Sequence, residues 1–109
     1  MSFIDLFKNK RNYSEDEWIR PYSQRVKEAL RQGNLPTAIA YLTKANELAP
    51  ERLDVLLMRA QIYQYGLGDF TAALKDYRAI LLQLENEPDR ELASKCKAGM
   101  KDMMGESES

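Results

Sequence analysis

Two matching blocks, 35 residues apart, constrain the fold of this chain more than any other feature of its sequence. The first block begins at Gly33 and Asn34, and the second begins at Gly68 and Asp69. The matched pairs are Gly33 and Gly68, Asn34 and Asp69, Leu35 and Phe70, Ala38 and Ala73, and Leu42 and Tyr77; three further pairs recur 34 apart, namely Tyr22 and Leu56, Val26 and Ala60, and Ala29 and Tyr63. A period of this length is typical of stacked repeats of supersecondary structure.

The apolar residues of these blocks recur three and four positions apart, which predicts α-helices. We expect one helix ending at Gly33, then helices over about 35–48, 53–65 and 70–84, and a last helix over about 88–104. The 109 residues include only five glycines and four prolines, and a chain rich in helix formers favours helices over strands. The expected fold class is therefore all-α, built from antiparallel helix hairpins, with a short additional helix at the N-terminus and no strand.

The expected organisation is an arm, one repeat domain and a tail. Its parts are an N-terminal amphipathic arm (1–13), a repeat domain (14–104) with repeats at about 19–52 and 53–87 and a capping helix at 88–104, and a disordered acidic tail (105–109). Pro21 should kink or restart the first helix near Arg20, because proline removes a backbone donor. Gly105 should end the last helix.

Composition excludes several classes of function. The chain has 16 Lys and Arg against 17 Asp and Glu, so no general attraction to nucleic acid or to an anionic membrane is expected. Histidine is absent, and with it the commonest general base and most zinc sites. Cys96 has no partner for a disulfide, and its stripe with Leu92 and Met100 indicates a small core residue rather than a nucleophile. We therefore expect no enzyme, cofactor or metal.

The same features bear on location. A single cysteine fits a reducing compartment, and no stretch approaches the roughly 20 apolar residues of a membrane span. The N-terminus lacks the basic start of a signal peptide. The sequence therefore predicts a cytoplasmic protein without a membrane segment.

Between Arg20 and Leu84 the chain resembles the tetratricopeptide repeat family. The residues that carry the resemblance are Tyr22, Val26, Ala29, Gly33, Asn34, Leu35, Ala38, Leu42, Ala45 and Pro50 in the first unit, and Leu56, Ala60, Tyr63, Gly68, Asp69, Phe70, Ala73, Tyr77 and Ile80 in the second. Arg25 and Arg59 stand where the family prefers leucine. Gly66 looks like a one-residue insertion, which accounts for a spacing of 34 before each block and 35 within it. The resemblance implies a right-handed stack of helix hairpins with a C-terminal capping helix.

The resemblance also implies a function and a surface. In this family the first helix of each unit lines a concave groove that receives a peptide or helix of a partner protein, so the chain is expected to serve as an adaptor or scaffold. Carried over by position, the groove residues are Arg20, Ser23, Gln24, Lys27 and Arg31 in the first unit and Asp54, Leu57, Met58, Gln61, Gln64 and Tyr65 in the second. The alternative is that these positions form an ordinary solvated helix face.

A second function class remains open, because the two ends of the chain are apolar. The N-terminal arm carries Phe3, Ile4, Leu6 and Phe7, and the last helix carries Met100, Met103 and Met104. A self-associating structural subunit would use these two surfaces as interfaces. Alternatively, the arm folds back over Trp18 and Tyr22 as an extra cap. We favour the monomer over the homodimer, since the short linker after Lys8 keeps the arm close to its own first unit.

Overall fold

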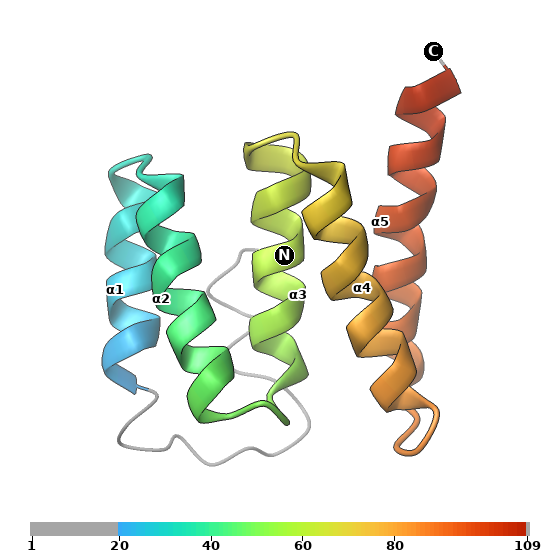
Figure 1. Ribbon diagram of the computed structural model, residues 1–109, viewed down its shortest axis with the longest axis horizontal. Helices are drawn as coiled ribbons and strands as arrows, with labels where there is room; N and C mark the ends of the chain where they lie inside the picture. The colour runs from blue at the N-terminus through green and yellow to red at the C-terminus, as the bar shows by residue number, and fades with distance from the viewer. Residues whose placement is uncertain (1–19, 109) are drawn as a thin grey trace. The chain divides into compact units, whose positions relative to one another are not determined.

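The computed structural model describes the backbone of residues 20–108 and the side chains of residues 20–105. Within this part of the chain the structure is entirely helical, without strands, which confirms the all-α prediction (Figure 1). The helices are α1 (Arg20–Arg31), α2 (Leu35–Leu48), α3 (Leu53–Gln61), the π-helical turn η2 (Ile62–Gly66), α4 (Phe70–Leu84) and α5 (Arg90–Glu108). The chain divides into two units, residues 1–59 and residues 60–109, and each is described by itself.

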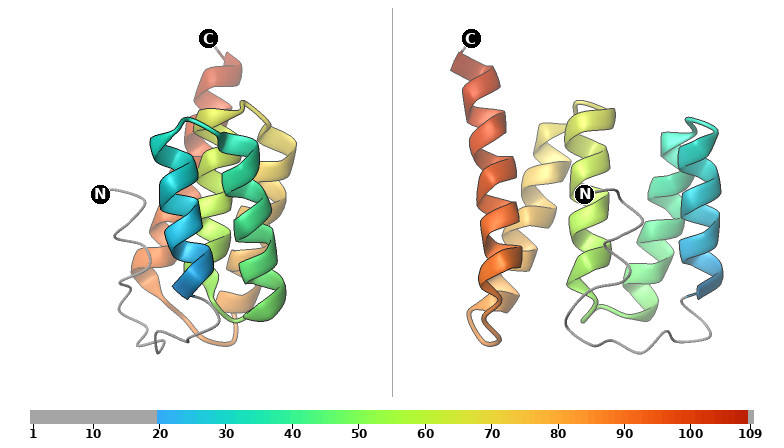
Figure 2. Two further views of the ribbon diagram at one scale, coloured as in Figure 1. Left: turned by 90° about the vertical axis from the view of Figure 1, so that its left-hand side faces the viewer. Right: turned by 180° about the vertical axis from the view of Figure 1, so that it is seen from behind.

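In the first unit, α1 and α2 pack as an antiparallel hairpin (Figure 2). Most of the buried residues are small: α1 buries Val26 and Ala29, and α2 buries Ala38, Leu42 and Ala45. Small residues at a crossing let two helix backbones approach closely and pack without voids. In the second unit, α4 packs against both η2 and α5.

The turns that precede α2 and α4 have the same construction, 35 residues apart. Gly33 and Gly68 have φ angles of 72° and 66°, a left-handed conformation that favours glycine. Asn34 and Asp69 follow with nearly identical backbone angles, φ −91° and ψ 80° or 81°. Each caps its helix, because its side-chain oxygen accepts a hydrogen bond from the backbone N–H three residues later, at 3.2 Å and 3.1 Å. The spacing in the sequence therefore corresponds to a repeated local structure.

The one-residue insertion predicted at Gly66 takes the form of η2. The backbone N–H of Asn34 donates to the carbonyl of Ala29, five residues before it, at 2.8 Å. The equivalent bond from Asp69 reaches Tyr63, six residues before it, also at 2.8 Å. The π-helical turn accommodates the extra residue, so Asp69 and Tyr63 are still joined by the same type of backbone hydrogen bond as Asn34 and Ala29. The prediction of an α-helix over 53–65 was wrong in its last turn: the α-helix ends at Gln61, and residues 62–66 form the π-helical turn.

Equivalent positions of the two blocks are buried alike. Ala38 and Ala73 are both 0% exposed, and the pair Leu42 and Tyr77 is 0% and 1% exposed. In each block a small residue and a bulky residue lie one helical turn apart, and both are buried. The two blocks therefore bury the same pattern of side-chain sizes.

The C-terminal helix is longer than predicted. Asp89 caps α5 by accepting a hydrogen bond from the Leu92 N–H at 3.1 Å. The helix then continues through Gly105 to Glu108, so the prediction that Gly105 ends it was wrong. Among the described glycines only Gly33 and Gly68 have a positive φ. A glycine without that conformation lowers helix stability by only about 1 kcal/mol relative to alanine and need not stop a helix.

Candidate functional site

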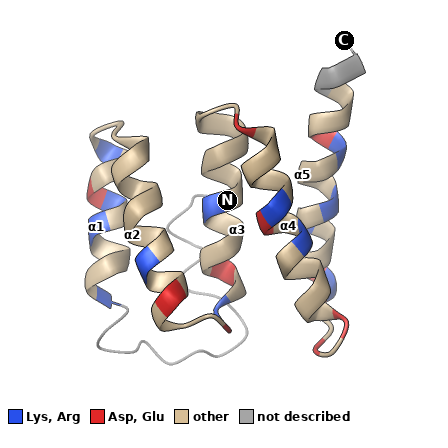
Figure 3. Cartoon of the chain, viewed as in Figure 1, with Lys and Arg blue, Asp and Glu red and all other residues tan. Residues whose placement is uncertain are grey.

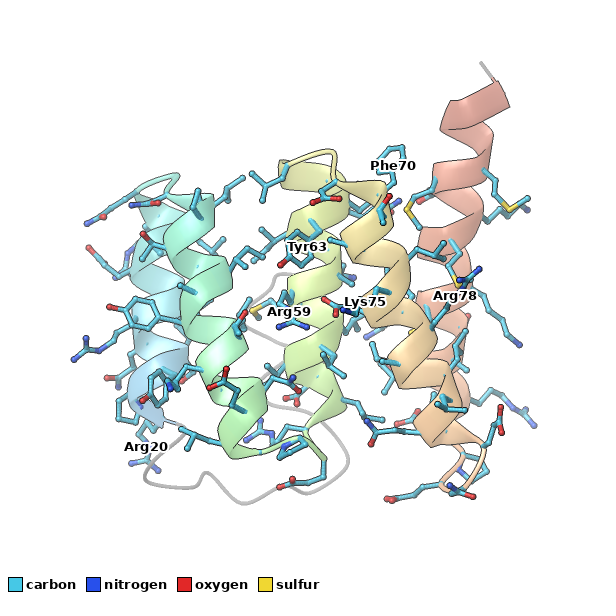
Figure 4. The ribbon with its side chains drawn as sticks, viewed as in Figure 1. Arg20, Arg59, Tyr63, Phe70, Lys75 and Arg78 are labelled. Carbon is cyan, nitrogen blue, oxygen red and sulfur yellow. The ribbon has the colours of Figure 1, made fainter. Side chains whose placement is uncertain are left out.

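The predicted groove residues of α1 form one face of that helix in the first unit. Arg20, Gln24 and Arg31 are exposed, and Ser23 and Lys27 are half-buried. They recur three, four and seven positions apart, which places them on the side opposite to Val26 and Ala29. Four of the twelve residues of α1 are basic and one is acidic, so this helix presents positive charge, as the blue segments in Figure 3 show. Arg20 lies at its first turn (Figure 4).

Arg31 is oriented by an acidic neighbour on the same helix. Its Nε donates to Glu28 Oε2 at 3.1 Å, its second nitrogen also pairs with that oxygen, and Gln32 donates to Glu28 Oε1 at 3.1 Å. The hydrogen bond and the charge of Arg31 lower the pKa of Glu28 below its usual value of 4.5. Because both partners are exposed, this pair fixes the position of the guanidinium more than it stabilises the fold.

An aromatic and cationic cluster joins α1 to α2 on the side of α1 away from this face, and the sequence analysis did not anticipate it. The Tyr22 and Tyr41 rings lie 6.3 Å apart at 48°. Arg25 lies over the Tyr41 ring at 5.6 Å and donates to its hydroxyl at 3.3 Å. The only sequence signal was Arg25 itself, since it stands where the repeat pattern prefers leucine. Arg25 covers the Tyr41 ring and links α1 to α2 rather than extending the basic face of Arg20, Lys27 and Arg31.

The predicted groove residues of α3 are buried, in contrast to those of α1. Asp54 is 5% exposed, and Leu57 and Met58 are each 1% exposed. These side chains are covered in this structure, and their place in an open groove stays a prediction. Asp54 accepts two hydrogen bonds from the buried Arg52, at 3.2 Å and 2.8 Å, which compensates the burial of both charges.

The second unit uses its predicted groove residues to hold α5. Gln64 is buried; its amide nitrogen donates to the Gly99 carbonyl at 2.9 Å, and its amide oxygen accepts from the Tyr77 hydroxyl at 2.7 Å. Tyr65 is 57% exposed, and its hydroxyl donates to Asp102 at 2.7 Å. Gln61 is half-buried. The amide of Gln64 is therefore committed to the fold, whereas the ring of Tyr65 remains accessible.

Two buried groups of the second unit, the Cys96 thiol and the Tyr77 hydroxyl, have raised pKa values. Burial raises the pKa of the Cys96 thiol from 9.0 to about 12, which keeps it protonated at neutral pH. Burial, and then the charges of Tyr65, Cys96, Asp102 and Asp76, raise the pKa of the Tyr77 hydroxyl well above 10.0. The prediction that Cys96 is a core residue is confirmed by its 0% exposure.

The residues predicted for self-association divide into three groups. Phe3, Ile4, Leu6 and Phe7 lie outside the described residues, as does Trp18. Met103 is buried and Met100 is half-buried, so α5 uses them for its own packing. Met104 is 65% exposed, and Leu82 on α4 is 64% exposed. Of the described residues predicted for self-association, Met104 alone is exposed, and Leu82 was not among those predicted.

Across the part of the chain that the structure describes, no three metal-ligating side chains gather closely enough to hold an ion. None of its helices has the length and apolar character needed to cross a membrane. No protein-family model matches the sequence. A search of solved structures likewise finds no significant match.

Proposed function

We propose that this chain is a non-catalytic protein-interaction module of the tetratricopeptide-repeat type, which binds a peptide or helix of a partner protein through α1. The observation that carries the proposal is the row of exposed and half-buried polar side chains along α1, on a helix whose opposite side is buried against α2. The repeated caps at Asn34 and Asp69 support a repeat scaffold. Helical repeats of this kind present extended surfaces to partners.

The chemistry of the residues argues against catalysis. The sequence has no histidine. The one thiol is buried and protonated, whereas a reactive cysteine needs an accessible thiolate. The same lone cysteine supports a reducing compartment such as the cytoplasm.

The charge on α1 defines the partner's chemistry. Arg20, Lys27 and Arg31 lie on one face of α1. A peptide or helix with acidic side chains would be attracted and oriented by this surface. Gln24 and Ser23 would then supply hydrogen bonds to the peptide backbone.

Quantitative capture from the native lysate tests this proposal. The bait proteins are the parent chain, the double variant Lys27→Glu with Arg31→Glu, and the control Lys44→Glu. The control is matched, because Lys44 also pairs with a glutamate three residues away, Glu47, at 3.2 Å, but on α2. We expect a partner retained by the parent and the control and lost by the double variant. Equal retention by all three would place the binding surface elsewhere.

A second candidate is a self-associating structural subunit. The exposed side chains of Leu82 and Met104 favour it, since two large apolar residues at about 65% exposure in one small unit lose water contact when an interface forms. Light scattering on the purified chain separates the candidates. A mass near 12.6 kDa at all concentrations favours the binding module, and a dimer mass that Leu82→Ser or Met104→Ser abolishes favours self-association.

A further inference from the structure

The charged face of α5 repeats the charged face of α1 at twice the period of the sequence. On α5 the cations are Arg90, Lys97 and Lys101, at spacings of seven and four residues. On α1 the cations Arg20, Lys27 and Arg31 have the same spacings, and each lies 70 residues before its counterpart. Because 70 residues are two periods of 35, the two helices are in the same register of the repeat.

The buried sides of α1 and α5 correspond in that register too. On α1, Val26 and Ala29 are 1% and 3% exposed. Their counterparts 70 residues later are Cys96, which is 0% exposed, and Gly99, which is also buried. In both helices the small residue of the pair therefore stands three positions after the larger one, and α5 matches α1 on its buried side as well as on its charged side.

The three cations of α5 form one row on the exposed side of the helix. At about 100° per residue, positions 90, 97 and 101 point within about 40° of one another, on the side opposite to Cys96 and Gly99. All three cationic side chains are exposed, as is Ser94, which lies in the same row. The blue segments along α5 in Figure 3 belong to its basic residues. At about 1.5 Å per residue, the row is about 16 Å long.

The acidic residues of α5 leave the charge of this row intact. Glu91 pairs with Lys95 at 3.4 Å, and Asp102 accepts a hydrogen bond from the Tyr65 hydroxyl at 2.7 Å. Both carboxylates point about 100° or more away from the row. Among the described side chains, none forms an ion pair with the three cations of the row. The row therefore presents three positive charges to an incoming ligand.

We propose that the row of Arg90, Ser94, Lys97 and Lys101, here called the α5 row, binds a second acidic segment of a protein partner. Carboxylates that recur three or four positions apart on a partner helix lie on one face and are complementary to this row in charge and direction. The Ser94 hydroxyl supplies a hydrogen-bond donor between the cations. The inference rests on the proposed function only for the chemical class of the partner, since the α5 row belongs to the other unit of the chain.

An acidic peptide fits the α5 row better than a nucleic acid does. Glu85, Glu87 and Asp89 stand directly before the row, in the turn between α4 and α5. A nucleic acid carries a negative charge at every phosphate, so a strand longer than the row would meet this acidic turn. The chain as a whole has a net charge of −1 and does not attract polyanions in general. A peptide can end, or change its charge, before the turn.

A titration followed by the backbone amide signals of the isotope-labelled full chain tests the inference. The probe is a helical peptide of about 12 residues in which glutamate recurs three and four positions apart, long enough to cover the row. The control peptide has glutamine at the same positions. We expect the signals of Ser94 and Ala98 to shift with the glutamate peptide and not with the glutamine peptide, and the shifts to weaken as salt is added.

Two double variants with equal changes of charge serve as controls for each other. Lys97→Glu with Lys101→Glu should weaken binding at Ser94 and Ala98 by about tenfold or more, because two attractions become repulsions. Lys27→Glu with Arg31→Glu should leave those shifts in place. The signals of Ser23 and Gln24 on α1 report the proposed function separately, and the spectrum of each variant also verifies its fold.

Several outcomes would overturn the inference. If Ser23 and Gln24 shift while Ser94 and Ala98 do not, the α5 row is a solvated helix face and the proposed function is unaffected. Shifts at Ser94 that survive Lys97→Glu with Lys101→Glu, or that disappear in the α1 variant, would show that the row does not bind the peptide by itself. A single-stranded DNA of equal charge that shifts Ser94 and Ala98 at lower concentration than the peptide would make the ligand a phosphate chain. Shifts at Ser94 without shifts at Ser23 would support the inference and contradict the proposed function.

Discussion

Gly99 matters because its missing side chain lets α4 and α5 approach. A Cβ at this position would overlap the Tyr77 hydroxyl oxygen and lie 2.6 Å from the ring carbon that bears it. The ring is 1% exposed and its hydroxyl is bonded to Gln64, so it has little freedom to move. Any side chain at position 99 must therefore displace Tyr77 or α5.

We predict that Gly99→Ala destabilises the protein by roughly 1–3 kcal/mol, the usual cost of overpacking a core. The matched control is Gly105→Ala on the same helix, where a Cβ would meet nothing within 4 Å. That change should stabilise by about 0.5–1 kcal/mol, because alanine loses less backbone entropy than glycine. Urea unfolding measures both. Equal midpoints for the two variants would contradict the close contact with Tyr77.

Stability should fall at high pH, because Cys96 and Tyr77 hold their protons more tightly in the fold than in the unfolded chain. Burial raises the pKa of Cys96 from 9.0 to about 12, and the pKa of Tyr77 rises from 10.0. Well below pH 9 both groups are protonated in both states, so their contribution is fully present. As pH rises above 9 the unfolded state binds fewer protons than the folded state, and the free energy of unfolding decreases.

Urea midpoints at about pH 7, 9 and 10.5 check this expectation. We expect a decrease between the second and third points that is smaller in Cys96→Ala than in the parent. Other groups titrate in the same pH range, so the contribution of the thiol is measured as the difference between the parent and Cys96→Ala. An identical decrease in both proteins would show that the thiol does not contribute.

At the scale of the element, η2 accommodates the one extra residue that separates Tyr63 from Asp69, relative to the spacing of Ala29 and Asn34. Deleting Gly66 should convert the six-residue hydrogen bond between Asp69 and Tyr63 into the five-residue form seen between Asn34 and Ala29. We expect a loss of roughly 1 kcal/mol or less, comparable to one hydrogen bond. Deleting Ala40, which lies inside α2, should be far more destabilising, because it rotates the rest of that buried stripe by about 100°. Similar losses for both deletions would contradict this role of η2.

The alanine at the helix crossing of the second block gives a test of the repeat itself. Ala73 is 0% exposed, as is its equivalent Ala38. Ala73→Leu should destabilise by roughly 1–3 kcal/mol, because it adds three carbon atoms to a filled crossing. Ala98→Leu, at an exposed position of α5, serves as the control. If Ala73→Leu unfolds at the same urea concentration as the parent, the alanine has no role in spacing the helices.

The sequence was most informative where structure depends on local chemistry. The caps Asn34 and Asp69 and the left-handed glycines before them were predictable, because turn and cap residues act within four positions. The insertion at Gly66 was visible as a change of spacing, although its π-helical form was not. The helical continuation through Gly105 was missed, because a glycine marks a helix end only when the chain adopts a positive φ there.

The candidate site was harder to predict, because it depends on contacts between distant residues. The groove positions were taken from the resemblance to a repeat family. Such a resemblance indicates which positions correspond to one another, but it does not indicate how exposed their side chains are. The apolar character of Leu57 and Met58 was a signal that their face is covered. Gln64 looked available to a ligand until the structure paired it with Gly99, 35 residues away, and no pattern in the sequence indicates that bond.

At the scale of the whole molecule, the proposed module should be a monomer in solution. We expect light scattering to give about the chain mass of 12.6 kDa from low to high concentration, since only scattered apolar side chains such as Leu82 and Met104 are exposed among the described residues. A dimer mass that persists on dilution would favour the structural subunit instead.

The salt dependence of partner binding tests the central claim most directly, namely that an acidic ligand binds the basic face of α1. The captured partner is titrated at several salt concentrations against the parent, Lys27→Glu with Arg31→Glu, and Lys44→Glu. The account predicts that the double variant binds more weakly and with a shallower dependence of log Kd on log salt, while the Lys44 variant follows the parent. Unchanged affinity and unchanged salt dependence in the double variant would contradict it.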